Sequence, residues 1–120
     1  MGLVKVKVTI GNVKRDIIKE KTFIADSGAF NTVVPPSLAK ELKLETLATT
    51  KVTLANGKSA EADISVAYIK LLDREGEFMV WIMKAPEPLL GATVFEGLGL
   101  AIDLSTGEVK HSRSFGLAAL

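Results

Sequence analysis

The chain has 120 residues, of which 48% are hydrophobic and 24% are charged, and its formal net charge is +1. This length fits one domain, and the hydrophobic content is enough to fill a core. The absence of cysteine excludes disulfides, thiolate metal sites and cysteine nucleophiles. The charges are mixed in sign and form no block typical of nucleic-acid or membrane-surface binding, so neither partner is expected.

The sequence contains no recognisable targeting signal or membrane-spanning segment. The chain shows no N-terminal signal pattern, and no apolar run approaches the roughly 20 residues that a transmembrane helix needs. We therefore expect a cytoplasmic protein. The chain has no glutamine and only three asparagines, which matches the avoidance of thermolabile residues in thermophilic proteins.

The first third of the chain predicts short strands. Residues 4–10 alternate between apolar and polar side chains, as in a half-buried strand. Gly11-Asn12 predicts a turn into a second strand over residues 13–18. The apolar runs Phe23–Ala25 and Thr32–Val34 predict two further strands.

A short helix is predicted to follow. Pro35-Pro36-Ser37 ends the preceding strand and suits a first helical turn. Leu38 and Leu42 lie four residues apart, so both would face the core.

A long hairpin is predicted over residues 50–72. Its turn is Asn56-Gly57, because both residue types tolerate positive φ. A second turn at residues 73–76 leads into a dense apolar strand at Phe78–Met83.

The last third predicts a second short helix at Ala92–Leu98 and a final hairpin. The hairpin would join Leu100–Leu104 to Glu108–Lys110. Frequent turns between short strands, with only two short helices, indicate an all-β, barrel-like domain. We place this domain at residues 1–112 and a C-terminal tail at 113–120.

One tripeptide stands out. Asp26-Ser27-Gly28 follows the apolar run Phe23–Ala25 and precedes Ala29-Phe30, so a carboxylate lies in apolar company. An Asx-turn, in which Asp26 bonds nearby backbone donors, is one explanation. A second motif, Leu89-Leu90-Gly91, comes later in the chain.

The two motifs together resemble the aspartic proteases. One such Asp in a chain of this length resembles the retropepsin-like branch, in its small prokaryotic or cellular single-domain form. The resemblance implies a closed, barrel-like acid-protease fold with one lobe per chain. It also implies a homodimer that hydrolyses peptide bonds in peptide or protein substrates, with no cofactor and no metal.

The resemblance assigns catalysis to Asp26, Ser27 and Gly28. Two Asp26 carboxylates at a two-fold axis would share one proton, because like charges that close cannot both ionise cheaply. The ionised carboxylate would activate water, and the protonated one would polarise the scissile carbonyl. The residues assigned to substrate binding are Ala29, Phe30, Val52, Leu54, Ala55, Asn56, Gly57, Leu90 and Gly91.

The hairpin around Asn56-Gly57 falls where such proteases place the flap that closes over substrate. Flaps of the viral enzymes are rich in glycine, whereas this hairpin has only Gly57. A plain solvent-facing hairpin is the alternative.

Other functions stay open on the residues alone. A retropepsin-fold peptide-binding or dimerisation module with little turnover would keep the fold without the reaction. A Ser-His-Asp site with Ser27 and His111, the single histidine, lacks a nucleophile-elbow pattern around the serine. Asp73 and Asp103 belong to predicted turns and are not expected to be second catalytic aspartates.

Overall fold

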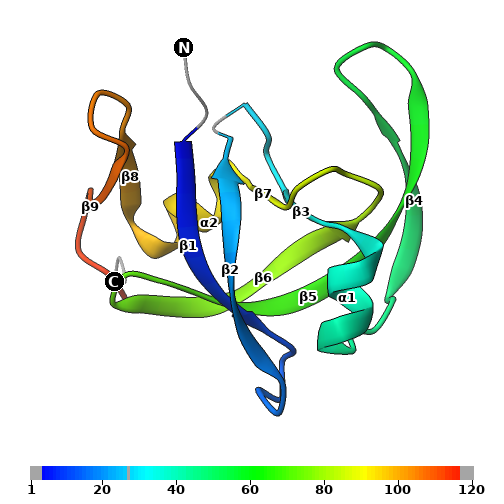
Figure 1. The fold of residues 1–120 in the computed structure, drawn as a ribbon, viewed down its shortest axis with the longest axis horizontal. Helices are drawn as coiled ribbons and strands as arrows, with labels where there is room; N and C mark the ends of the chain where they lie inside the picture. The colour runs from blue at the N-terminus through cyan, green and yellow to red at the C-terminus, as the bar shows by residue number, and fades with distance from the viewer. Residues whose placement is uncertain (1–3, 27, 117–120) are drawn as a thin grey trace, which may run out of the picture.

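The structure is a computed structural model that describes residues 4–26 and 28–116. In chain order its elements are β1 (Val4–Gly11), β2 (Ile18–Ala25), β3 (Thr32–Val34), α1 (Pro36–Leu42), β4 (Ala48–Thr53), β5 (Ser59–Leu71), β6 (Arg74–Ile82), β7 (Leu89–Leu90), α2 (Ala92–Leu98), β8 (Leu100–Asp103) and β9 (Glu108–His111). Figure 1 shows how they are arranged. The predicted mostly-β domain with two short helices is confirmed within these residues.

The main sheet closes on itself. Its strand order is β1-β2-β7-β3-β6-β5-β4, and β1 also pairs with β5, which joins the first strand to the other side of the sheet. Strand β4 stays outside this ring, paired with β5 only, while β8 and β9 form a separate two-stranded sheet. A closed ring leaves few open sheet edges, and the predicted barrel-like architecture is thereby confirmed.

The β1–β2 hairpin differs from the prediction. The predicted strand at residues 13–18 is wrong, because residues 12–17 form a loop and β2 begins at Ile18. Asn12 closes this loop by accepting the amide hydrogen of Asp16 on Oδ1, at 3.2 Å, and Arg15 adopts a φ of 60°. The predicted strand Phe23–Ala25 is the end of the same long strand.

The residues at the ends of both helices explain where each helix begins and ends. Pro36 lies in the first turn of α1, where its missing amide hydrogen costs nothing, and Lys43 ends the helix with a φ of 56°. Helix α2 starts after Gly91 and ends at Gly99, whose φ is 66°. The inward faces are apolar, with Leu38 and Leu42 of α1 buried as predicted.

The β5–β6 turn is tighter than predicted. Leu71 pairs with Arg74, so the turn consists of Leu72 and Asp73 alone, and the predicted turn at residues 73–76 is wrong. Gly76 instead lies within β6, where an added Cβ would come 3.2 Å from the Phe78 ring. This glycine makes room for an aromatic side chain and does not turn the chain.

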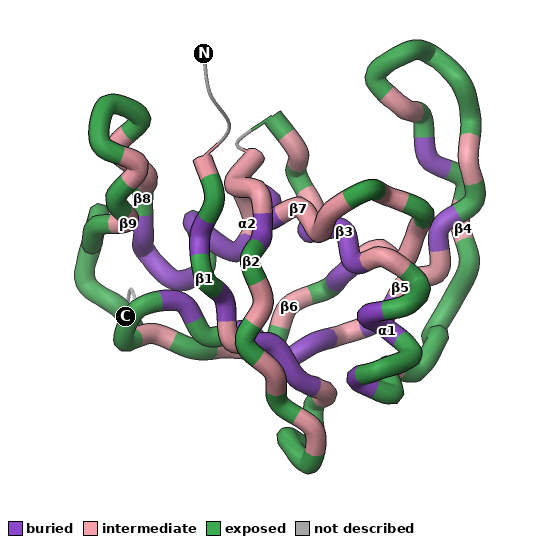
Figure 2. Tube along the Cα trace, in the orientation of Figure 1, coloured by how far each residue is buried: buried purple, intermediate pink, exposed green. Residues whose placement is uncertain are grey.

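The core fills the inside of the ring. Its fully buried side chains come from β1, β2, β3, β5, β6, β7 and both helices: Val8, Ile10, Phe23, Val34, Leu42, Ile69, Val80, Leu90, Val94 and Leu98. Burying one such side chain contributes about 1.5–3 kcal/mol. Figure 2 shows the buried stretches running along the strands, while the loops and hairpin tips are exposed.

Two arginines hold the segment after β9. Arg74 donates to the carbonyl oxygens of Leu98 and Gly99, each at 2.9 Å, and to that of Arg113 at 2.8 Å. Arg113 in turn donates to the Glu96 carbonyl. Arg113, the first residue assigned to the tail, is therefore anchored to the end of α2. Residues 117–120 lie outside the described part, and the domain boundary stays a prediction.

Candidate active site

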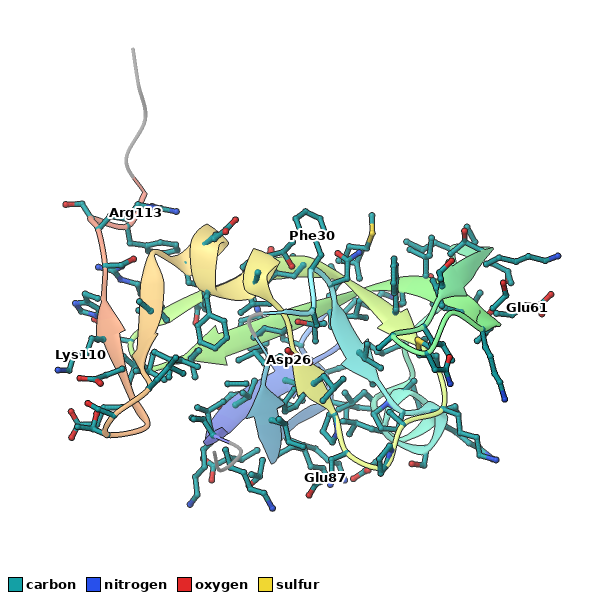
Figure 3. All side chains as sticks on the ribbon, turned by 90° about the horizontal axis from the view of Figure 1, so that it is seen from above. Asp26, Phe30, Glu61, Glu87, Lys110 and Arg113 are labelled. Atoms are coloured by element: carbon teal, nitrogen blue, oxygen red, sulfur yellow. The ribbon has the colours of Figure 1, made fainter. Side chains whose placement is uncertain are left out.

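Asp26 is the first residue after β2, and the sheet positions its backbone. Strand β2 runs parallel to β7, with Ala25 opposite Leu90, and the Asp26 amide donates to the Leu90 carbonyl at 3.0 Å. Its side chain is half-buried in the single chain. Figure 3 shows Asp26 near the middle of the molecule, with Phe30 beyond it at the edge.

The Asp26 loop folds back on its own carboxylate. The Gly28 amide donates to Asp26 Oδ1 at 3.0 Å, and the Ala29 amide donates to the Asp26 carbonyl at 3.1 Å. A Cβ on Gly28 would lie 3.3 Å from Asp26 Oδ1, which is tight. The Asx-turn expected from the sequence is present. Ser27, also predicted to be catalytic, lies outside the described residues.

The Leu90-Gly91 motif packs against this loop, as the sequence predicts. The amides of Ala92 and Thr93, in the first turn of α2, donate to the carbonyls of Ala29 and Phe30 at 2.8 and 3.1 Å. A Cβ on Gly91 would come 2.5 Å from the Asn31 carbonyl carbon. Only glycine allows these two segments to approach so closely.

Thr32 is a site residue that the sequence reasoning missed. Its hydroxyl oxygen accepts the Gly91 amide hydrogen at 3.0 Å, and its side chain is fully buried. The bond ties β3 to the N-terminus of α2 beneath the Asp26 loop. The available signal was a lone hydroxyl beside Val33 and Val34 in an otherwise apolar strand.

The β4–β5 hairpin rises on the same side of the barrel as the β2–β3 connection that carries Asp26 (Figure 1). At its tip, Ala55, Asn56 and Gly57 are exposed, and Leu54 is half-buried. Val52, which the sequence assigns to substrate binding, is only 7% exposed and so is already covered in the single chain.

The hairpin turn uses the two predicted residues differently. Gly57 alone takes a positive φ, of 83°, and its amide donates to the Leu54 carbonyl at 2.9 Å. Asn56 instead accepts the Lys58 amide hydrogen on Oδ1 at 3.0 Å. A turn followed by a left-handed glycine is typical of three-residue hairpin loops.

Asp26 has no charge partner among the described residues. None of the ion pairs between the described residues involves this carboxylate. His111 lies 2.7 Å from Asp73 at the β5–β6 turn, and this hydrogen bond lowers the pKa of the Asp73 carboxyl. The single histidine is therefore engaged away from the Asp26 loop, which gives the Ser-His-Asp alternative no support.

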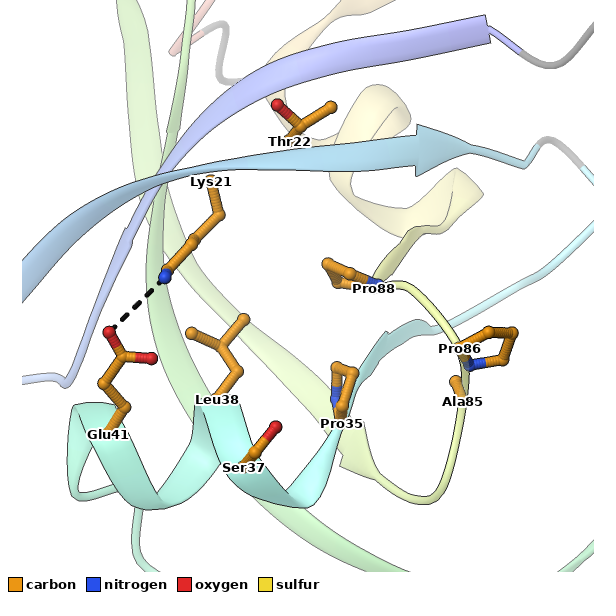
Figure 4. A pocket seen from close by; sticks show the side chains of 9 residues that line it. All are labelled: Lys21, Thr22, Pro35, Ser37, Leu38, Glu41, Ala85, Pro86 and Pro88. Carbon is orange, nitrogen blue, oxygen red and sulfur yellow. Dashed lines mark ion pairs between the residues drawn. The ribbon is translucent and has the colours of Figure 1, made fainter.

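Asp26 does not line either of two pockets found in the described parts of the chain. One, of about 270 Å³, lies between α1 and the proline-rich segment before β7, with Lys21 and Glu41 paired at 3.3 Å on its rim (Figure 4). The other, of about 630 Å³, lies beside the β1–β2 loop. Neither of these two pockets therefore encloses the Asp26 carboxylate.

Residues 4–26 and 28–116 contain neither a candidate metal site nor a candidate membrane-spanning helix. No group of three or more histidine, aspartate or glutamate side chains there is arranged to hold a metal ion. No helix among these residues has the length and apolar character needed to cross a membrane.

Comparisons with known proteins agree with this geometry. A family model described as aspartyl protease matches residues 6–95, which include Asp26 and Gly91. No curated protein sequence matches the chain. Among solved structures, the EIAV protease complexed with the inhibitor HBY-793 is similar, with a TM-score of 0.65 at 19% identity over 82% of this chain and 89% of that one. The predicted retropepsin-like fold is thus confirmed.

Proposed function

This chain belongs to the aspartyl protease family, and we propose that it is an endopeptidase that acts as a homodimer, with Asp26 from each protomer in one catalytic pair. The observation that carries the proposal is the single Asp26 loop in a chain that builds one lobe. Aspartic protease chemistry needs two carboxylates, and a two-fold axis supplies the second.

The proposed reaction needs only the two carboxylates and water. Two like charges at the axis cannot both ionise cheaply, so the pair shares one proton and titrates as a unit. The ionised Asp26 removes a proton from water as the water attacks the scissile carbonyl carbon. The protonated Asp26 hydrogen-bonds the carbonyl oxygen and stabilises the charge that develops there.

The surroundings of Asp26 suit this chemistry. The Asp26 amide donates to the Leu90 carbonyl, and the amides of Ala92 and Thr93 donate to the loop, so the backbone that carries the carboxylate has a fixed position before substrate arrives. In the proposal, Ser27 hydrogen-bonds across the dimer and locks the two loops together. Gly28 has no side chain, so a peptide can approach the two carboxylates closely.

The exposure of the Phe30 side chain suggests that another group covers it in the active dimer. Its side chain is 70% exposed in the single chain, which is unusual for a large aromatic group. A partner protomer or an apolar side chain of the substrate would cover it, as would the tip of the β4–β5 hairpin acting as a flap. Leu90 itself is fully buried, so in this proposal it meets substrate through its backbone.

A peptide-library digest from acidic to neutral pH tests the proposal. We expect endoproteolytic cleavage next to apolar residues, inhibited by a transition-state inhibitor of aspartic proteases and absent in Asp26→Asn. The matched control is Asp73→Asn, which removes an exposed carboxylate outside the site and should cleave normally.

Two results would overturn the proposal. Cleavage by Asp26→Asn at the wild-type rate would remove Asp26 from the mechanism. Tight peptide binding with no cleavage at any pH would support the peptide-binding module instead.

A further inference from the structure

The larger pocket is a groove at the opposite end of the barrel from Asp26. Its floor is Ser65 and Val66 of β5, one wall is the β1–β2 loop with Asn12 and Val13, and the other wall contains Leu44 and Leu47. Strand β2 separates this end from the Asp26 loop, since it runs from Ile18 to Ala25, about 26 Å in extended chain. The groove is therefore distinct from the proposed active site.

The groove lies over a gap in the pairing of β5. Strand β4 pairs with β5 as far as Ile64, and β1 pairs with it from Tyr68 onward. Residues 65–67 are left between these two neighbours on that edge. An unpaired stretch of strand edge offers backbone donors and acceptors to another chain.

Val66 presents those groups to the groove. The Leu47 amide donates to the Ile64 carbonyl at 2.7 Å, so the backbone groups of Ile64 point toward this edge. Alternate residues of a strand point the same way, which directs the N–H and C=O of Val66 into the gap. Val66 has no partner in β1 or β4, and none of the backbone hydrogen bonds outside the strand pairings of the described residues uses either group.

The walls of the groove are held in place. Asn12 Nδ2 donates to the Leu42 carbonyl at 3.1 Å and ties the β1–β2 loop to the end of α1. Arg15 packs over the Tyr68 ring, 4.3 Å from its centroid, and pairs with Glu77 at 3.1 Å. A binding surface that is already formed loses little entropy when a ligand arrives.

The lining selects an apolar ligand. Val13 and Leu47 are 52% and 61% exposed, although both are large apolar side chains. The charges of the lining balance, since it contains Lys14 and Lys43 as well as Asp16 and Glu45. A ligand of strong charge of either sign therefore gains little here.

We propose that this groove binds a short extended peptide segment that carries an apolar side chain. One residue of the peptide adds to the edge of β5, accepting the Val66 amide hydrogen and donating to the Val66 carbonyl. Its apolar side chain packs between Val13 and Leu47. The space between β1 and β4 admits about three extended residues, or about 10 Å, so the ligand is a chain end or a short exposed loop. The proposal stands independently of the catalytic one.

Amide chemical shifts test this site directly. The probe is acetyl-Ala-Leu-Ala-amide, added to Asp26→Asn protein so that cleavage cannot interfere. We expect the Val66 amide to shift most, with smaller changes at residues 12–14 and 43–47. A second probe is the same peptide with a methyl group on the leucine nitrogen, which removes one of the two hydrogen bonds. It should bind several-fold more weakly.

A pair of variants locates the apolar contact. Leu47→Glu places a charge in the wall and should weaken binding of the peptide by about tenfold. Leu104→Glu changes another exposed leucine, 72% accessible, in the β8–β9 turn, and should leave binding unchanged.

Three outcomes would overturn the proposal. The first is an unchanged Val66 amide at millimolar peptide. The second is equal binding of the N-methylated peptide, which would remove the strand-edge contact. The third is equally tight binding of leucinol, a small apolar molecule without a peptide chain, which would make the groove a general apolar pocket.

Discussion

Two aspartates of this chain form the same local turn and have different surroundings. Asp26 accepts the Gly28 amide hydrogen at 3.0 Å, and Asp103 accepts that of Ser105 at 2.9 Å. Both side chains are half-buried. The Asx-turn is therefore common to both residues and cannot by itself mark a functional site.

The surroundings separate them. Asp103 also bonds the Ser105 hydroxyl at 2.6 Å and Lys110 at 3.3 Å, so its charge is satisfied within one hairpin. The carboxylate of Asp26 receives only the Gly28 amide from the described residues, while its loop is held by distant segments. A fixed carboxylate without a local charge partner is available for chemistry, and a satisfied one stabilises a turn.

Removing each charge in turn gives the largest expected contrast. Asp26→Asn keeps the shape of the side chain and can still accept the Gly28 amide hydrogen, but it cannot activate water. We expect peptide cleavage to fall at least about a hundredfold. Asp103→Asn should cleave at the wild-type rate. Initial rates with a fluorogenic peptide make the comparison, and an equal loss in both variants would contradict it.

Alanine in place of glycine tests how tightly each loop is packed. Gly91→Ala would place a Cβ 2.5 Å from the Asn31 carbonyl carbon, so backbone must move, and we expect a loss of about 3 kcal/mol or more in unfolding free energy. Gly107, beside the Asp103 turn, has a φ of 75°, and its nearest neighbour would be Val4 Cγ1 at 3.8 Å. Gly107→Ala should cost only about 1 kcal/mol, from backbone strain.

Urea unfolding measures both variants. Equal stability losses would mean that the Asp26 loop can relax around an added methyl group, against the close packing seen at Gly91.

Removing the hydroxyl of Thr32 or of Thr106 should give a smaller difference in stability. Thr32→Val leaves the Gly91 amide buried without an acceptor, which should cost about 1–3 kcal/mol. Thr106→Val removes an exposed bond that the Glu108 amide donates to Thr106 Oγ1, at 3.2 Å, where water can replace the acceptor. We expect a change within about 0.5 kcal/mol. Thermal unfolding distinguishes the two, and an undiminished stability of Thr32→Val would show that the buried bond matters little.

Acid should weaken the Asp103 hairpin. The Ser105 hydroxyl, the Ser105 amide and Lys110 lower the pKa of Asp103 from 3.8 to about 2. Because the folded pKa is the lower one, the stabilisation is present above the unfolded pKa and is lost as pH falls from about 4 to about 2. The protection factors of the β8–β9 amides, which are corrected for the intrinsic pH dependence of hydrogen exchange, should fall as pH drops over this range in the wild type. The protection factors in Asp103→Asn should stay flat, and parallel curves would exclude Asp103 as the cause.

Local signals in the sequence predicted most of the fold. The alternation of β1, Pro36 at the start of α1 and the Asn56-Gly57 turn each act within a few residues, so pattern and backbone preference suffice. The β1–β2 loop was misread because Val13 and Ile17 continue an apolar pattern, whereas the side chain of Asn12 closes the chain into a loop.

Only part of the candidate site could be predicted from the sequence. Asp26 and Gly91 belong to a recognisable pair of motifs, so their proximity could be predicted. Thr32 could not, because its partner amide lies 59 residues away and only the folded barrel brings them together. The free edge at Val66 depends on where β1 and β4 stop pairing with β5, which no single segment specifies.

Mixing wild-type and Asp26→Asn protein tests the central claim, that one active site needs Asp26 from two chains. The two proteins are unfolded together, refolded at constant total concentration, and assayed for cleavage as the wild-type fraction varies. A shared pair predicts activity proportional to the square of that fraction, so an equal mixture retains about a quarter of the wild-type rate. A linear decline, with about half of the rate retained, would mean that each chain works alone and would contradict the account.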